Sequence, residues 1–124
     1  MNRPLIAIVN DASAQAHLLD LLLTRAGYRT VTHRQRTGAY ALLKQTRPAL
    51  LTLNIKTEQR ATGWRVLNDL RRDPTLRRLP VLIYSAAPQI AAQVAARSDP
   101  YCAVLPLVFD HDRLPAIIAQ MIAR

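Results

Sequence analysis

The stretch Leu5-Ile6-Ala7-Ile8-Val9-Asn10-Asp11 begins with a continuous apolar run and ends in two polar side chains. An unbroken apolar run of this length is typical of a parallel strand that is covered on both faces. A second, largely apolar run, Leu50-Leu51-Thr52-Leu53-Asn54, also ends in a polar residue. The two runs therefore predict buried strands of a parallel sheet, with polar side chains at their carboxyl ends.

Outward from these runs, strand and helix patterns alternate along the whole chain. Further strands are predicted at 29–33, 81–84 and 102–105. Helices are predicted from the caps Ser13 and Thr37, after Gly63, from Pro88 and from the cap Asp112. In the first of these helices, the side chains expected to face the core are His17, Leu18, Leu21 and Leu22. The alternation predicts an α/β fold, a five-stranded parallel sheet with helices on both faces, as one domain over 1–124.

The chain is strongly basic. It has 124 residues, with 17 Lys and Arg against 8 Asp and Glu, for a net charge of +9. Such a balance favours attraction to nucleic acid, acidic lipid or an acidic protein surface. The alternative is that an arginine-rich genome has given an ordinary surface this charge. Two clusters of arginine stand out along the sequence: Arg65, Arg71, Arg72, Arg77 and Arg78 around the third helix, and Arg25, Arg29, Arg34 and Arg36 near the second strand.

Cysteine and hydropathy patterns exclude several classes of protein. The single cysteine, Cys102, cannot form an internal disulfide or a cysteine-based zinc site. It is expected to be an inert residue of a buried strand. No apolar run is long enough for a membrane span. The cytoplasm is therefore the expected location.

In parallel α/β sheets, ligands bind at the carboxyl ends of the strands. The residues expected there are Asn10, Asp11, Asn54, Ser85 and Leu105.

Four short segments carry a resemblance to a known family. Their order along the chain is Ala26-Gly27-Tyr28, Arg47-Pro48-Ala49-Leu50-Leu51, Gly63-Trp64-Arg65-Val66-Leu67 and Leu79-Pro80-Val81-Leu82-Ile83. In this order and spacing they resemble the response-regulator receiver family, which includes the chemotaxis response regulators. The resemblance covers essentially the whole chain. It implies a (βα)5 flavodoxin-like receiver fold and a role in a bacterial two-component, or phosphorelay, signalling system.

The resemblance also implies which positions would carry the family's phosphotransfer chemistry. The acidic pair that holds magnesium in the family matches Asn10 and Asp11, and the phosphoacceptor aspartate matches Asn54. The hydroxyl that binds the phosphoryl group matches Ser85, and the lysine before the proline matches Leu105. The chain therefore departs from the family at three of these functions: the acidic pair is half lost, and both the acceptor and the lysine are absent.

These departures predict loss of phosphorylation. An amide is not a nucleophile toward phosphorus as a carboxylate is. Asp11 with two neutral asparagines is a poor magnesium site, so no cofactor is expected and the protein is expected not to be an enzyme. Ser85 is expected to bond local backbone. Asp11 is expected either to cap the first helix or to pair with a cation, and Lys56 is a candidate to reach Asp11 and take the place of the metal.

Two functions remain as hypotheses. The first is a pseudo-receiver that acts by protein–protein interaction, with a signalling protein or as a homodimer. The resemblance implies an interaction face with contributions from Ile90, Gln93, Arg97, Tyr101 and Arg113. The alternative is a module that binds nucleic acid or another polyanion on the same fold, through the arginine cluster around the third helix.

Overall fold

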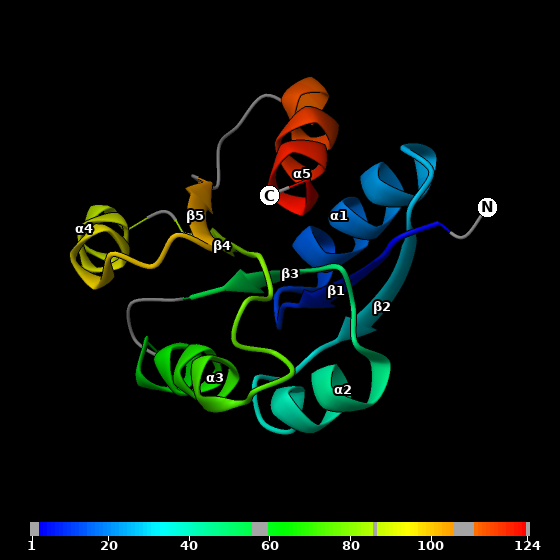
Figure 1. Cartoon of the computed structure of the whole chain (residues 1–124). Coiled ribbons are helices and arrows are strands. Elements are labelled where there is room, and N and C mark those ends of the chain that lie inside the picture. The colour runs from blue at the N-terminus through cyan, green and yellow to red at the C-terminus, as the bar shows by residue number, and fades with distance from the viewer. Residues whose placement is uncertain (1–2, 56–59, 86, 106–110, 124) are drawn as a thin grey trace.

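The computed structural model describes residues 3–55, 60–85, 87–105 and 111–123. Five parallel strands form one sheet in the order β2-β1-β3-β4-β5 (Figure 1). The strands are β1 (Leu5–Val9), β2 (Arg29–His33), β3 (Leu50–Asn54), β4 (Val81–Tyr84) and β5 (Cys102–Leu105). The helices are α1 (Ser13–Arg25), α2 (Ala39–Thr46), α3 (Arg60–Arg72), α4 (Pro88–Arg97) and α5 (Leu114–Ile122), with a 3-10 turn, η2 (His111–Arg113), before α5. The predicted fold class and all five predicted strands are confirmed.

The helices cover the sheet on both faces (Figure 1). Ile6 and Ile8 of β1 pack with α1 and α5 on one face, and Ala7 and Val9 pack with α2, α3 and α4 on the other. Successive side chains of a strand point to opposite faces, so a strand covered on both sides favours apolar residues at nearly every position. None of the described helices has both the length and the apolar character needed to cross a membrane.

The register of the sheet aligns the carboxyl ends of the central strands. Val9 pairs with Leu53, and Tyr84 pairs with Asn54 on one side and with Leu105 on the other. The residues that follow β1 and β4 therefore emerge at the same edge as the end of β3. This edge carries the polar side chains that the sequence predicts for the site.

Three helix predictions were wrong in detail. The buried face of α1 is formed by Ala16, Leu19 and Leu23, while His17 is exposed. Each helical residue turns the chain by about 100°, so a predicted face that is offset by one residue points largely past the core. α3 begins at Arg60, before the glycine expected to precede it. The caps are also different, as described next.

The three predicted side-chain caps, Ser13, Thr37 and Asp112, were wrong. α1 follows Ala12, α2 follows Gly38 and α5 follows Arg113, and none of these helix starts has a capping bond from a side chain. Gly38 has φ of 82°, a left-handed conformation that glycine adopts without steric cost. This turn sets the direction in which the loop after β2 enters α2, and that loop lies beside the site.

Gly63 allows α3 to pack closely on the end of β3. A Cβ atom at this position would lie 2.8 Å from Cγ1 of Ile55, the residue after Asn54. Gly63 and Ile55 are both buried. A side chain at residue 63 would therefore push α3 away from the sheet edge that carries the site.

Candidate functional site

The polar residues predicted from the strand ends do meet at one edge of the sheet. Asn10, Asn54 and Ser85 are buried there, Asp11 is half-buried, and Leu105 is buried at the end of β5. The parallel register brings them together, because every strand of the sheet ends at this edge.

Arg36 enters this edge from the loop after β2. Its side chain is only 4% exposed. One terminal nitrogen, Nη2, lies 3.3 Å from Oδ2 of Asp11. The other, Nη1, donates to the Asn54 side-chain oxygen Oδ1 at 2.8 Å and to its backbone oxygen at 3.3 Å. A guanidinium that is almost fully removed from water therefore has both of its terminal nitrogens bonded to the predicted site.

The Asn54 amide links the two charged groups. Its nitrogen Nδ2 donates to Oδ1 of Asp11 at 3.3 Å, while its oxygen accepts from Arg36. Asp11, Arg36 and Asn54 therefore form a closed triangle, here called the Arg36 triangle. One carboxylate and one guanidinium balance each other in charge, and the neutral amide supplies a donor to the acid and an acceptor to the base.

The loop that carries Arg36 is tied to the strand ends by further bonds. Nε of Arg34 donates to the backbone oxygen of Asn10 at 3.3 Å, and Nη2 of Arg34 lies 3.5 Å from the backbone oxygen of Asp11. Nε2 of His33 lies 2.9 Å from the backbone oxygen of Thr37. The backbone of the loop is thereby held on both sides of Arg36, which limits the positions that its side chain can adopt.

Asn10 and Ser85 are engaged locally. Oδ1 of Asn10 accepts from the backbone N–H of Ala12 at 2.9 Å, and its amide nitrogen donates to Gln15. Oγ of Ser85 accepts from the backbone N–H of Ala87 at 3.1 Å. These are short-range side-chain turns of the kind that Asn and Ser often form. The expectation that Ser85 bonds local backbone is confirmed, and of the two roles expected for Asp11 the structure displays the pairing with a cation.

The donor set does not fit a magnesium ion. Magnesium takes near-octahedral oxygen ligands, with carboxylates among them. Among the described residues, Asp11 is the carboxylate at this edge of the sheet, and it uses Oδ1 for the Asn54 amide and Oδ2 for Arg36. The side-chain oxygen of Asn54 points at the same guanidinium. Among the described residues, no group of three or more His, Cys, Asp or Glu side chains comes close enough to hold a metal ion.

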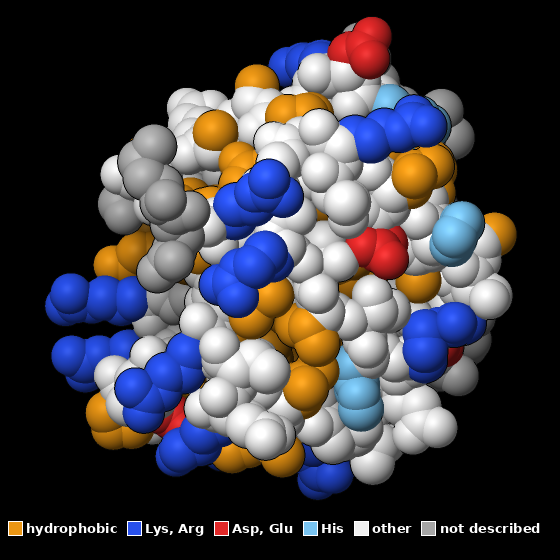
Figure 2. Space-filling view, turned by 90° about the vertical axis from the view of Figure 1, so that its right-hand side faces the viewer, with side chains coloured by type: hydrophobic (Ala, Val, Ile, Leu, Met, Phe, Trp, Pro, Cys, Tyr) orange, Lys and Arg blue, Asp and Glu red, His pale blue; other side chains and the backbone are white. Residues whose placement is uncertain are grey.

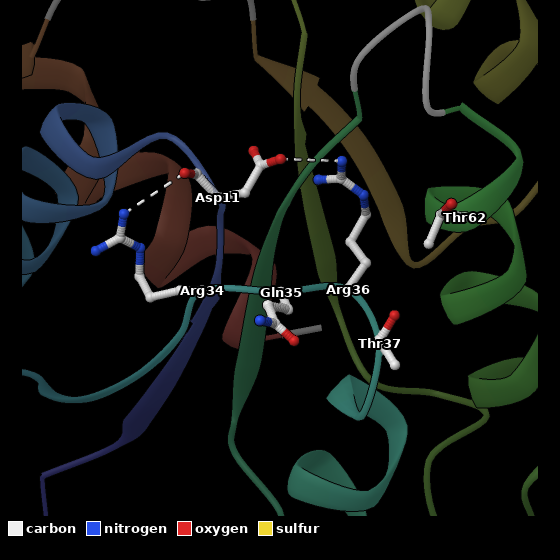
Figure 3. Close-up of a pocket in the computed structure, with 6 residues that line it drawn as sticks. All are labelled: Asp11, Arg34, Gln35, Arg36, Thr37 and Thr62. Atoms are coloured by element: carbon white, nitrogen blue, oxygen red, sulfur yellow. Dashed lines mark hydrogen bonds and ion pairs between the residues drawn. The ribbon is translucent and has the colours of Figure 1, made fainter.

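A shallow cavity of about 270 Å³ opens beside the triangle (Figure 3). In Figure 3, Arg36 points toward Asp11 and Arg34 lies on the other side of Asp11, so the two guanidinium groups flank the acid. The remaining lining comes from the same loop and from the first turns of α3: Gln35, Thr37 and Thr62. Arg36 is thus a wall of this cavity on one side and a partner of Asn54 on the other.

The predicted interaction face is only partly a surface. Ile90 is 1% exposed and packs in the core, so its inclusion was wrong. Gln93 and Arg113 are exposed, and Tyr101 is half-buried. Arg97 is exposed but is turned toward α3, where Nη2 donates to Asn68 at 2.8 Å and the guanidinium lies 5.4 Å from the ring centre of Trp64.

The predicted basic patch also needs one correction. Arg71 points inward, where Nε donates to Asp99 at 2.6 Å and Nη1 donates to the backbone oxygen of Leu79 at 2.9 Å. It holds α3 to the segment before β5 and is not available to a polyanion. The exposed members are Arg65, Arg72, Arg77 and Arg78. On the β2 side of the molecule, Figure 2 shows Lys and Arg side chains spread widely among few acidic ones.

Arg36 is the site residue that sequence reasoning placed wrongly. It was assigned to a basic cluster near the second strand, whereas its guanidinium is buried against Asp11 and Asn54. It lies 18 residues before Asn54 in a loop, and no local pattern distinguishes it from Arg34. Lys56, the residue predicted to take the place of the metal, lies outside the described residues.

The fold is shared with several solved structures. A sensor protein from Polaromonas sp. JS666 aligns over 98% of each chain with a TM-score of 0.85 and 22% identity. The receiver domain of a signal transduction histidine kinase from Syntrophus aciditrophicus aligns with 97% of this chain and 90% of its own, with a TM-score of 0.81 and 23% identity. The receiver domain of a sensor histidine kinase from Pseudomonas aeruginosa PAO1 has a TM-score of 0.83 and 18% identity over 99% of this chain and all of its own. That structure has a magnesium ion coordinated in its active site cleft.

Among curated proteins, none matches this chain significantly. A sequence model of the response regulator receiver domain, in contrast, matches residues 6–119, which include every residue of the Arg36 triangle. The family match, the strand order and the alignment of the strand ends agree, so this chain belongs to the response regulator receiver domain family of two-component signalling.

Proposed function

We propose that this protein is an atypical receiver domain that is not phosphorylated at the usual position and acts by binding a protein partner in the cytoplasm. The observation that carries the proposal is Asn54, which occupies the end of β3 with both polar atoms of its amide bonded inside the Arg36 triangle. The family uses an aspartate at the matching position. An amide nitrogen has a delocalised lone pair and offers no nucleophile to phosphorus.

Two further positions support the loss of phosphotransfer. Leu105 is buried where the family has the lysine that neutralises a phosphoryl group, so that compensating charge is missing. Oγ of Ser85, the matching hydroxyl, accepts a hydrogen bond from the backbone N–H of Ala87. We infer that the domain has no use for a phosphoryl group and is not an enzyme.

Protein binding is proposed through the face formed by α4, β5 and α5. Gln93 is exposed on α4, Arg113 is exposed at the end of η2 just before α5, and Tyr101 lies half-buried just before β5. A Tyr and an Arg near the centre of a patch are the residue types that most often anchor an interface. The partner is a protein of the same signalling system or a second copy of the chain.

A first experiment tests phosphorylation. The purified chain is incubated with acetyl phosphate and Mg²⁺ and its intact mass is measured. We expect no phosphoryl adduct, and a stable adduct on the native protein would contradict the proposal.

A second experiment tests the interaction face. A photo-crosslinking amino acid is introduced at Gln93 on α4 or, as a matched control, at Gln45, an exposed glutamine on α2. In the cells that encode the protein, we expect a defined crosslinked partner at residue 93 but not at residue 45, unchanged by added acetyl phosphate. The same product at both positions, or none at residue 93, would count against this face.

A second candidate function is binding of a polyanion, which the exposed arginines favour. Arg65, Arg72, Arg77 and Arg78 extend from α3 into the turn that follows it. Arginine suits bidentate contacts with phosphate. The one tryptophan, Trp64, is half-buried with Arg97 over its ring, so it does not offer an open stacking surface to a base.

A further inference from the structure

We propose that the Arg36 guanidinium is the resident cation of this pocket and that it keeps divalent metal ions out, beyond what the loss of carboxylates achieves. The proposal deepens the proposed function, since it concerns the same pocket and explains how the pocket remains stable without metal and phosphoryl group. The guanidinium of Arg36 lies where an oxygen of Asp11, after β1, and an oxygen of Asn54, at the end of β3, converge. A cation is stabilised most strongly at such a place.

The first argument is occupancy. A metal at this place would need Oδ2 of Asp11 and Oδ1 of Asn54, and Arg36 holds both, at 3.3 and 2.8 Å. Binding would require the guanidinium to leave a site where its side chain is 4% exposed. The loop gives little room for this, because Arg34 and Thr37 on either side are tied to the β1 end and to His33.

The second argument is charge. Among the described residues that line this pocket, Asp11 carries the one negative charge and Arg34 and Arg36 carry positive charges, so these residues give an incoming divalent ion no net negative charge to bind. It would also be repelled by a guanidinium a few ångströms away, in surroundings that screen charge poorly. Restoring a carboxylate at residue 54 would give Arg36 two acids to bind, which strengthens its hold.

The third argument is the match between Asn54 and Arg36. The amide presents nitrogen to Asp11 and oxygen to Arg36. An aspartate here would place an oxygen, in place of the nitrogen, 3.3 Å from a carboxylate oxygen of Asp11. Asn54 therefore avoids the repulsion that a second carboxylate beside Asp11 would cause and that a metal would have to offset. Arg36 supplies the positive charge that pairs with the remaining carboxylate, that of Asp11.

The experiment compares metal binding by the full chain and its variants. Mn²⁺ and Mg²⁺ affinities are measured by titration calorimetry for the native chain, Asn54→Asp, Asn54→Asp with Arg36→Ala, and Asn54→Asp with Arg34→Ala. Arg34 is the matched control, because it lies in the same loop and, among the described residues, its side chain bonds to the backbone oxygens of Asn10 and Asp11 and not to their side chains. We expect the Arg36→Ala double variant to bind at least about tenfold more tightly than the other three.

Equal affinity in Asn54→Asp and its Arg36→Ala derivative would overturn the proposal, and so would an equal gain from Arg34→Ala. If Arg36→Ala does not fold, Arg36→Met keeps the length of the side chain and tests the same charge. The native chain provides a further test. Its melting temperature should not rise with Mg²⁺, and a clear rise would refute the proposal that Arg36 occupies the place of the metal. A phosphoryl adduct on the native chain would refute the proposed function. If the single variant Asn54→Asp binds metal as tightly as the double variant, only the role of Arg36 is refuted.

Discussion

Gly63→Ala is expected to destabilise the protein, although the same change in most helices is favourable. Gly63 lies inside α3, and replacing a glycine by alanine within a helix ordinarily gains about 1 kcal/mol from helix propensity. The new Cβ, however, would lie 2.8 Å from Cγ1 of Ile55 and 3.3 Å from its Cγ2 and Cδ1. Carbon atoms in contact prefer about 3.5–4.0 Å, so Ile55 or α3 must move.

The size of the effect follows from where Ile55 lies. Ile55 is 1% exposed and packs in the core between the sheet and the helices α2, α3 and α4. Its side chain is surrounded by other side chains and cannot move aside into solvent. Overpacking of a core costs about 1–3 kcal/mol, and a contact this short belongs in the upper half of that range. After subtraction of the helix gain, the free energy of unfolding should fall by about 1–2 kcal/mol.

The assay is urea unfolding followed by circular dichroism and by the fluorescence of Trp64, with a double-mutant cycle as its control. In an Ile55→Ala background the obstructing atoms are gone, so Gly63→Ala should there become stabilising by up to about 1 kcal/mol. This reversal of sign identifies the contact as the cause. A stabilising effect of Gly63→Ala in the native background, or the same effect in both backgrounds, would refute the reasoning.

Three further predictions concern charge and ionisation. Asp73 is buried and accepts hydrogen bonds from Tyr40, Thr75 and Lys44, which hold its pKa below the usual range. Its stabilising contribution is complete above the ordinary aspartate pKa of about 3.9 and is lost as the pH falls toward the lower folded value. The stability difference between the native chain and Asp73→Asn in urea titrations should therefore shrink in acid, and a difference that grows would contradict this. Burial raises the pKa of Cys102 to about 11, so its thiol should react slowly with a thiol reagent at neutral pH and quickly in denaturant. Equal rates in both conditions would disprove it. If the exposed arginines bind a polyanion, fluorescence anisotropy should show that generic DNA and RNA bind and that the affinity falls with salt. For duplex DNA, the logarithm of the binding constant should fall against the logarithm of the salt concentration with a slope of about −0.9 for each phosphate neutralised. No binding at low salt would exclude that role, and the residues to replace together are Arg65, Arg72, Arg77 and Arg78.

Much of the fold could be predicted because it depends on local patterns. The apolar runs 5–9 and 50–54 specify strands covered on both faces wherever they are placed, and the alternation with helices leaves few arrangements of the sheet. The start of α2 was harder. Thr37 has the chemistry of a cap, yet Gly38 takes the capping position through its backbone conformation. The part of Thr37 that does form a contact is its backbone oxygen, which lies 2.9 Å from Nε2 of His33.

The site divides in the same way. Asn10, Asp11, Asn54 and Ser85 were predicted together because each follows or ends a strand, and parallel strands end at one edge. Arg36 was not predicted as part of the site, because the path of its loop depends on Gly38, Arg34 and His33 acting together. For the same reason, the inward turn of Arg71 toward Asp99 cannot be distinguished in sequence from the outward turn of its neighbour Arg72.

The strand positions, and the catalytic groups that are missing at the strand ends, can be read from the sequence. Those properties belong to single residues and to short apolar runs. The side chain of Asn54 is not a nucleophile and that of Leu105 carries no charge, whatever packs around them. The packing of distant segments, in contrast, places the guanidinium of Arg36, and not that of Arg34, against the carboxylate of Asp11. Arg34 and Arg36 have the same charge and nearly the same place in the chain, but a buried guanidinium is stable only where acceptors from other segments surround it. Asp11 and Asn54 provide those acceptors to Arg36, and they reach it from 25 and 18 residues away.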